Sequence, residues 1–112
     1  MARSGLGEED LTITVVIAND VATVSVIGEV DVFSVRQLSG AITSQIDAGT
    51  GRVIVDLSGV TFIDGFSIEI LVGLTVAAAG AHMELVFANP SRQFLRVKQL
   101  VDSRRVLHVL TS

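Results

Sequence analysis

The pattern of apolar and polar positions divides this chain into alternating short strands and helices. Residues 11–18 and 21–27 are rich in β-branched side chains and are predicted to be strands. Asn19 and Asp20 lie between them, and such residues favour a tight turn, so the two strands are expected to form a hairpin. Period-two alternation places apolar side chains on one face of the second strand, at Ala22, Val24 and Val26.

The next part of the chain has a helical period. Residues 28–31, Gly-Glu-Val-Asp, are predicted to turn the chain into a helix that begins near Val35 and has one apolar face. Residues 48–51 end this helix with glycine at the position that a C-cap favours. Residues 53–55 form an apolar strand, and residues 56–60 are predicted to be a turn-rich loop.

An almost wholly apolar helix is predicted from Asp64 onward. Residues 83–87 form a further strand, Asn89-Pro90-Ser91 stops it and caps a third helix near 94–101, and residues 106–110 end the domain as a short strand. The predicted order is ββαβαβαβ, an α/β fold with a mixed sheet, an N-terminal hairpin and right-handed βαβ crossovers.

The turn before the central helix is the predicted functional region. Asp64 is a good N-cap residue, because its carboxylate can accept hydrogen bonds from the free N–H groups of the first helical turn. α/β proteins often place their sites where a strand leads into a helix through such a turn. We therefore expect function to lie at residues 64–67, Asp-Gly-Phe-Ser.

The central helix is apolar on two opposite faces. At about 100° per residue, one face suits the sheet and carries Ile68, Leu71, Val72, Thr75 and Ala79. The other face is apolar or small where a solvated helix would carry charge, and it contains Phe66, Ile70, Gly73 and Ala77. Such a face either packs against another helix or forms an interaction site.

Composition narrows the function classes. The 112 residues suit one domain, with residues 1–10 as a polar tail and residues 11–112 as the folded part. A net charge of -4 argues against nucleic-acid binding, and the absence of cysteine excludes disulfides and thiolate metal sites. No signal peptide precedes the domain and no apolar stretch is long enough to span a bilayer, so we expect a cytoplasmic protein. His82 and His108 are isolated, and no cofactor or metal is expected.

Three motifs together carry a resemblance to a known family. Gly28-Glu29-Val30-Asp31 follows a hairpin, residues 55–64 (VDLSGVTFID) precede an apolar helix, and Asn89-Pro90-Ser91 comes later at a matching spacing. In this arrangement, which extends from Leu11 to Leu110, the chain resembles the STAS domain, and within it the bacterial anti-sigma factor antagonists. The resemblance implies a non-catalytic protein-interaction regulator of transcription whose partner is an anti-sigma factor with a kinase fold. A homodimer is also compatible with the sequence.

The resemblance also implies a phosphorylation switch, and this chain departs from it. In the family, the aspartate that matches Asp64 is followed by a small residue and then by a serine or threonine that the partner kinase phosphorylates. Phe66 occupies that acceptor position here, so Ser67 is the only adjacent fallback acceptor. Asp31 either begins the first helix or, as the resemblance implies, lies near the switch. The partner-binding residues are expected to be Asp31, Asp64, Gly65, Phe66, Ser67 and Ile70.

Two other functions stay open from the sequence. One is a STAS subunit of a lipid or anion transport complex. The other is a receiver-like phosphoacceptor domain that uses Asp56 or Asp64, although the only lysine, Lys98, lies within a predicted helix. No glycine-rich phosphate loop and no nucleophile–histidine–acid set is present, so we do not expect an enzyme.

Overall fold

The structure is a computed structural model that describes residues 11–110, and the predicted tail, residues 1–10, lies outside them. The elements follow one another in the predicted order ββαβαβαβ. The strands are β1 (Thr12–Ala18), β2 (Val21–Val30), β3 (Arg52–Ile63), β4 (Glu84–Ala88) and β5 (His108–Leu110). The helices are α1 (Val35–Asp47), α2 (Gly65–Gly80) and α3 (Arg92–Val101).

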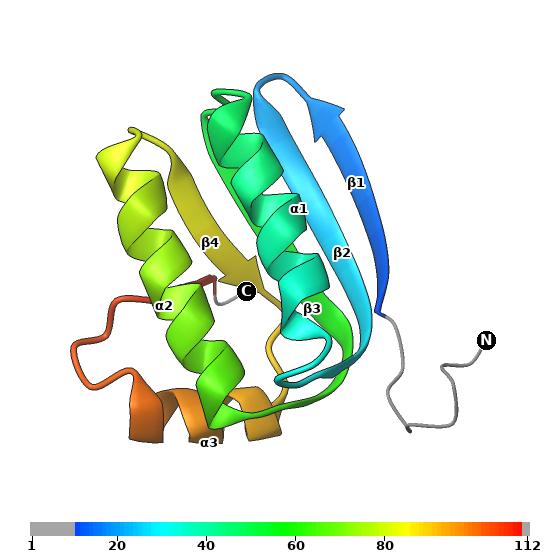
Figure 1. The fold of residues 1–112 in the computed structure, drawn as a ribbon, viewed down its shortest axis with the longest axis vertical. Helices are drawn as coiled ribbons and strands as arrows, with labels where there is room; N and C mark the ends of the chain where they lie inside the picture. The colour runs from blue at the N-terminus through cyan, green and yellow to red at the C-terminus, as the bar shows by residue number, and fades with distance from the viewer. Residues whose placement is uncertain (1–10, 111–112) are drawn as a thin grey trace.

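The five strands form one mixed sheet in the spatial order β1-β2-β3-β4-β5. β1 and β2 are antiparallel, and the other three neighbouring pairs are parallel. Helices α1 and α2 lie side by side over one face of the sheet, while α3 lies across the end at which β4 finishes (Figure 1). This is the mixed α/β architecture that the sequence predicted.

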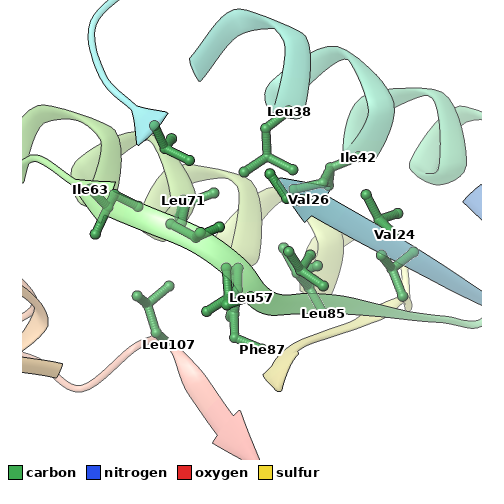
Figure 2. Close-up of a cluster of buried hydrophobic side chains, with 14 of the residues drawn as sticks. Val24, Val26, Leu38, Ile42, Leu57, Ile63, Leu71, Leu85, Phe87 and Leu107 are labelled. Atoms are coloured by element: carbon green, nitrogen blue, oxygen red, sulfur yellow. The ribbon is translucent and has the colours of Figure 1, made fainter. Parts of the chain in front are cut away.

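The core lies between the sheet and the two long helices. Every second residue is buried in the first six residues of β2 and of β3, as the period-two pattern requires, and β4 buries three consecutive residues. Leu38 and Ile42 of α1 and Leu71 of α2 point toward these strand residues (Figure 2). The sheet contributes Ala22, Val24, Val26, Val53, Val55, Leu57, Leu85 and Phe87 to this layer.

Two predicted turns prove to be parts of long strands. The prediction of a turn at residues 28–31 was wrong, because β2 continues to Val30. The predicted loop at residues 56–60 was also wrong, because β3 runs without a break to Ile63. The pairing register of β2 and β3 shifts twice along this stretch. Polar residues and glycines that resemble a turn in the sequence are therefore residues of a bulged ladder.

Gly59 shows why the bulge needs a glycine. A Cβ atom at this position would lie 2.8 Å from the backbone oxygen of Val26 and 2.7 Å from Cγ1 of Ile27. Leu57, Val60 and Ile63 are buried around it, so the chain remains a strand although its register shifts. The glycine lets the two strands approach closely where a larger residue would push them apart.

Helix α2 is rotated slightly from its predicted orientation. Ile68, Leu71 and Thr75 face the core as expected, and the opposite face, for which the sequence left helix packing or an interaction site open, is exposed or half-buried. Ala79, however, is exposed and Val72 only half-buried, whereas Ser67 and Ala78 are buried. Apolar side chains surround this helix, so the hydrophobic pattern did not fix the rotation to within one residue.

The last strand begins at His108 and not at Val106 as predicted. The buried carboxylate of Asp102 accepts hydrogen bonds from the N–H groups of Val106 at 2.8 Å and Leu107 at 2.9 Å, which takes these amides away from the sheet. Burial by itself raises the pKa of Asp102, but the Leu107 and Val106 N–H groups and Lys98 outweigh it, so that the pKa lies below its ordinary value of 3.8.

Candidate functional site

Asp64 caps α2 as the sequence predicted. Its backbone is extended, with φ -97° and ψ 171°, and its Oδ1 atom accepts a hydrogen bond from the Ser67 N–H at 2.8 Å. The Asp64 N–H donates to the Val30 carbonyl at 3.2 Å, which connects the cap to the end of β2. Such a cap contributes about 1 kcal/mol to helix stability.

Helix α3 holds the same turn from the other side. The side-chain amide of Gln93 accepts from the Ile63 N–H at 3.0 Å and donates to the Ile63 carbonyl at 2.7 Å. A Cβ atom at Gly65 would lie 3.3 Å from Cγ2 of Val101, so a larger residue would press against α3. The start of α2 is therefore fixed on both sides, and Gly65 is placed by packing.

Asp31 organises the loop that leads into α1. Its Oδ1 atom accepts hydrogen bonds from the N–H groups of Phe33 at 3.0 Å and Ser34 at 2.9 Å. The Ser34 hydroxyl in turn donates to the Glu29 carbonyl at 2.7 Å. Asp31 thus fixes the turn that leads into α1, whose N-cap residue is Ser34. Within this hydrogen-bonded loop, Val32 and Phe33 are exposed to solvent, with 60% of the Phe33 surface accessible.

A groove lies between α1 and α2 and ends near the Asp31 loop. Phe66 and Ile70 line its α2 side, and 48% of Phe66 remains exposed. The other side consists mainly of small or short polar residues of α1, which hold the surface open. A Cβ atom at Gly40, for example, would meet nothing within 4 Å. The residues of this α1–α2 groove are Val32, Val35, Arg36, Ser39, Gly40, Thr43, Phe66 and Ile70.

The groove combines predicted residues with others that sequence reasoning missed. Phe66 and Ile70 were predicted to be partner-binding residues on the face of α2 opposite the sheet, and Ile70 also packs against the core and is only half-exposed. Val32 in the groove and its exposed neighbour Phe33 beside it were missed. Their signal is two apolar residues just before the helix start at Ser34, at positions that neither the strand pattern nor the helix face requires. The short residues Ser39 and Gly40 carried no signal of their own.

Ser67, the predicted fallback acceptor, lies in the first turn of α2 but is buried. Its accessible surface is 0%, and within residues 11–110 its hydroxyl has no hydrogen-bond partner. The slight rotation of α2 turns this side chain toward the core. The sole fallback acceptor is thus inaccessible in the folded domain, while Phe66 one residue earlier faces solvent.

The residues needed by a receiver-like phosphoacceptor are not arranged for that chemistry. Asp56 lies in the middle of β3, where its Oδ1 atom accepts from the Asn89 amide and the Ser58 N–H, each at 3.0 Å. The Asn89 hydrogen bond and then that from Ser58 lower the pKa of Asp56. The Nζ atom of Lys98 lies 3.4 Å from Oδ2 of Asp102, at the C-terminal end of α3. Within residues 11–110, no three histidine, aspartate or glutamate side chains are grouped to hold a metal ion.

A comparison with protein families matches residues 12–111 to the STAS domain. The chain belongs to the STAS domain family. A search of curated protein sequences found no match. No helix within the described part of the chain is both long and apolar enough to cross a bilayer.

Solved structures with the same fold include anti-sigma factor antagonists. One from Mycobacterium paratuberculosis is 22% identical, with a TM-score of 0.78 over 91% of this chain and 86% of that chain. The unphosphorylated form of SpoIIAA, an antagonist known as a Bacillus cell fate determinant, is 16% identical, with a TM-score of 0.69 over 90% and 89%. SLC26A9 is 14% identical, with a TM-score of 0.70 over 83% of this chain but only 18% of that chain. At these identities the matches establish the shared fold of this STAS domain.

Proposed function

We propose that this STAS domain is a non-catalytic regulator of the anti-sigma factor antagonist type, which binds a kinase-fold anti-sigma factor in the cytoplasm. The observation that carries the proposal is the apolar α1–α2 groove with the half-exposed Phe66 at its edge. Exposed apolar residues gathered beside a rigid helix start are typical of a protein-binding surface. The exposed pair Val32 and Phe33 extends this surface toward the Asp31 loop.

Asp31, Asp64, Gly65 and Ser67 contribute to this surface indirectly. In Asp31 and Asp64, one carboxylate oxygen accepts hydrogen bonds from backbone N–H groups. Gly65 fits closely against α3, and Ser67 is buried. Under the proposal, they fix the backbone that presents Phe66 to the partner. Phe66 and Ile70 then supply the contact area, because preorganised apolar side chains bind with a small loss of conformational entropy.

The proposal includes the absence of the usual phosphorylation switch. A phosphate adds about two negative charges and would disrupt an apolar contact. Phe66 has no hydroxyl to accept one, and Ser67 is buried with its N–H bonded to Asp64. We therefore infer that binding to the partner is constitutive.

The groove can be blocked without harming the helix that forms it. Gly40→Met places a side chain where a Cβ has open space, and methionine favours a helix by roughly 0.7 kcal/mol over glycine. Gly80→Met is the matched control, because a Cβ there also meets nothing and the site lies at the other end of α2. We expect Gly40→Met to weaken binding to kinase-fold anti-sigma factors of the native host in calorimetric titrations, while Gly80→Met binds normally. Equal binding by both variants would place the partner surface elsewhere.

Phosphate mapping tests the second part of the proposal. The protein is incubated with the same anti-sigma factors and ATP, and modified residues are located by mass spectrometry. We expect no phosphate at Ser67 in wild type, and we expect Phe66→Ser to become a substrate that releases the partner once phosphorylated. Efficient phosphorylation of wild-type Ser67, lost in Ser67→Ala and coupled to release, would restore the switch one residue along and refute constitutive binding.

A further inference from the structure

The outer edge of β1 lacks the features that normally prevent strands from pairing with another chain. β1 is the first strand of the sheet, so within residues 11–110 only its inner edge, toward β2, is paired. Its sequence, Thr-Ile-Thr-Val-Val-Ile-Ala, contains no charge and no proline, and its pairing with β2 is continuous over all seven residues. Natural edge strands usually carry lysine, proline or a bulge to prevent such pairing.

The edge also exposes large apolar side chains. The accessible fraction is 39% for Val15 and 60% for both Val16 and Ile17. On the neighbouring strand, Ile27 is likewise exposed and lies opposite Thr12. A seven-residue, uncharged, β-branched segment of this kind is well suited to forming a strand pair with another chain.

The hairpin turn determines which backbone groups face outward. Asn19 and Asp20 have φ of 53° and 65°, so the turn is a two-residue turn closed by the facing pair Ala18 and Val21. Such a closing pair is hydrogen-bonded, and hydrogen-bonded pairs then alternate along an antiparallel ladder. Residues 18, 16, 14 and 12 therefore direct their N–H and C=O groups toward β2. Ile13, Val15 and Ile17 direct theirs toward the free edge.

These three outward-facing residues are symmetric about Val15. If a second β1 pairs antiparallel with Val15 opposite its own copy, Ile13 of each chain faces Ile17 of the other. All three pairs are then of the hydrogen-bonded kind, which gives about six inter-chain hydrogen bonds. On the helix-covered face of the sheet, Ile13, Val15 and Ile17 of both chains meet as one apolar cluster, because residues two apart share a face. On the other face, Val16 meets Thr14.

We propose that β1 is a dimerisation edge that pairs with β1 of a second copy of this chain, joining the two sheets into one across a twofold axis at Val15. The helices permit this approach. Helix α1 packs against both β1 and β2, so the two α1 helices of a dimer, each centred between these strands, would lie about two strand spacings apart, roughly 10 Å, which matches the 8–10 Å between packed helices. The α1–α2 groove stays accessible, since it lies on the far side of α1 from β1. The dimer therefore does not depend on the proposed function.

A charge swap at the twofold axis tests this register. Sedimentation equilibrium over a wide concentration range should show wild type passing from the mass of one chain to that of two. Val15→Lys places two like charges opposite each other and should raise the dissociation constant on the order of tenfold or more, as should Val15→Glu. An equimolar mixture of the two variants should dimerise again, because lysine then faces glutamate. Val16→Lys is the matched control on the same strand and should have the weaker effect, because it faces Thr14.

A cysteine scan gives a second readout that does not depend on affinity. The natural chain contains no cysteine, and a Val15→Cys pair would have Cα atoms about 5.5 Å apart, within the range that a disulfide bridges. Oxidation should therefore link Val15→Cys into dimers far faster than Thr14→Cys. A wild type that stays monomeric at high concentration would overturn the proposal. So would a dimer that survives Val15→Lys, or a mixture of the charge variants that remains monomeric.

Discussion

Phe66→Ala is the sharpest test of the α1–α2 groove as a partner surface. An aromatic side chain of this size presents roughly 200 Å², and 48% of Phe66 is accessible in the free domain. About 100 Å² thus remains for a partner to bury, which at about 25 cal/mol per Å² corresponds to about 2.5 kcal/mol. If the partner covers the ring fully, we expect the dissociation constant to rise by up to roughly 60-fold.

The same substitution also affects folding, so binding and stability must be measured separately. The buried half of the ring contacts the domain itself, and its loss lowers the free energy of unfolding by up to about 2.5 kcal/mol. Alanine recovers roughly 0.5 kcal/mol through its higher helix propensity. Binding is therefore measured by calorimetry well below the melting temperature, where the variant is folded, and stability by urea denaturation.

Val76→Ala provides the matched control for this experiment. Val76 lies on the same helix and is 59% exposed, but at 100° per residue it is turned about 120° away from Ile70 and does not line the groove. It should leave the dissociation constant unchanged. If Phe66→Ala binds as well as wild type, or loses no more affinity than Val76→Ala, then the groove is not the partner surface and the area argument fails.

Three further predictions concern stability, each measured by urea denaturation. Because the folded-state pKa of Asp102 lies below 3.8, its carboxylate stabilises the fold above that pH and the contribution is lost as the pH falls through the folded pKa. Asp102→Asn should lower the free energy of unfolding by about 2 kcal/mol at neutral pH, and its difference from wild type should shrink in acid; a pH-independent difference would contradict this. Gly59→Ala should cost about 1–3 kcal/mol because its Cβ would collide with β2, whereas Gly40→Ala, whose Cβ has open space, should gain about 0.5–1 kcal/mol. Asp64→Ala should cost about 1 kcal/mol through the lost N-cap bond, and a neutral result would mean that water replaces that bond without penalty.

The element order could be predicted because each element carries its own local signal. Buried apolar side chains alternate with less buried ones over the first six residues of β2 and of β3. The caps at Asp64 and Ser91 both form, the latter accepting from the Phe94 N–H at 3.0 Å. The β2–β3 bulge could not be predicted, because Gly28 and Gly59 lie beside polar residues, and such glycines usually indicate turns. Only the pairing of β2 with β3, which are distant in sequence, shows that these glycines lie where the register of the ladder shifts.

Only those parts of the site that depend on residues close together in the sequence could be predicted. The capping role of Asp64 depends on residues within the next turn, so it follows from the sequence. The groove depends on the distance between α1 and α2, which is set by how each helix packs on the sheet. The burial of Ser67 depends on a rotation of α2 by part of a turn, and a helix that is apolar on nearly every side does not encode this rotation in its hydrophobic pattern.

The neighbouring positions 66 and 67 together determine how this protein can be regulated under the proposed function. A kinase can phosphorylate a hydroxyl group only if that group projects from the protein surface into the kinase active site. Phe66 is exposed but has no hydroxyl, and Ser67 has one but could reach a kinase only if the first turn of α2 opened. That opening would break the Asp64 cap and the contact of Gly65 with α3, and it would expose Ile68 of the core. Because a phosphate at this turn is thus disfavoured, occupancy of the partner is expected to follow mass action, set by the concentrations of the two proteins and their dissociation constant.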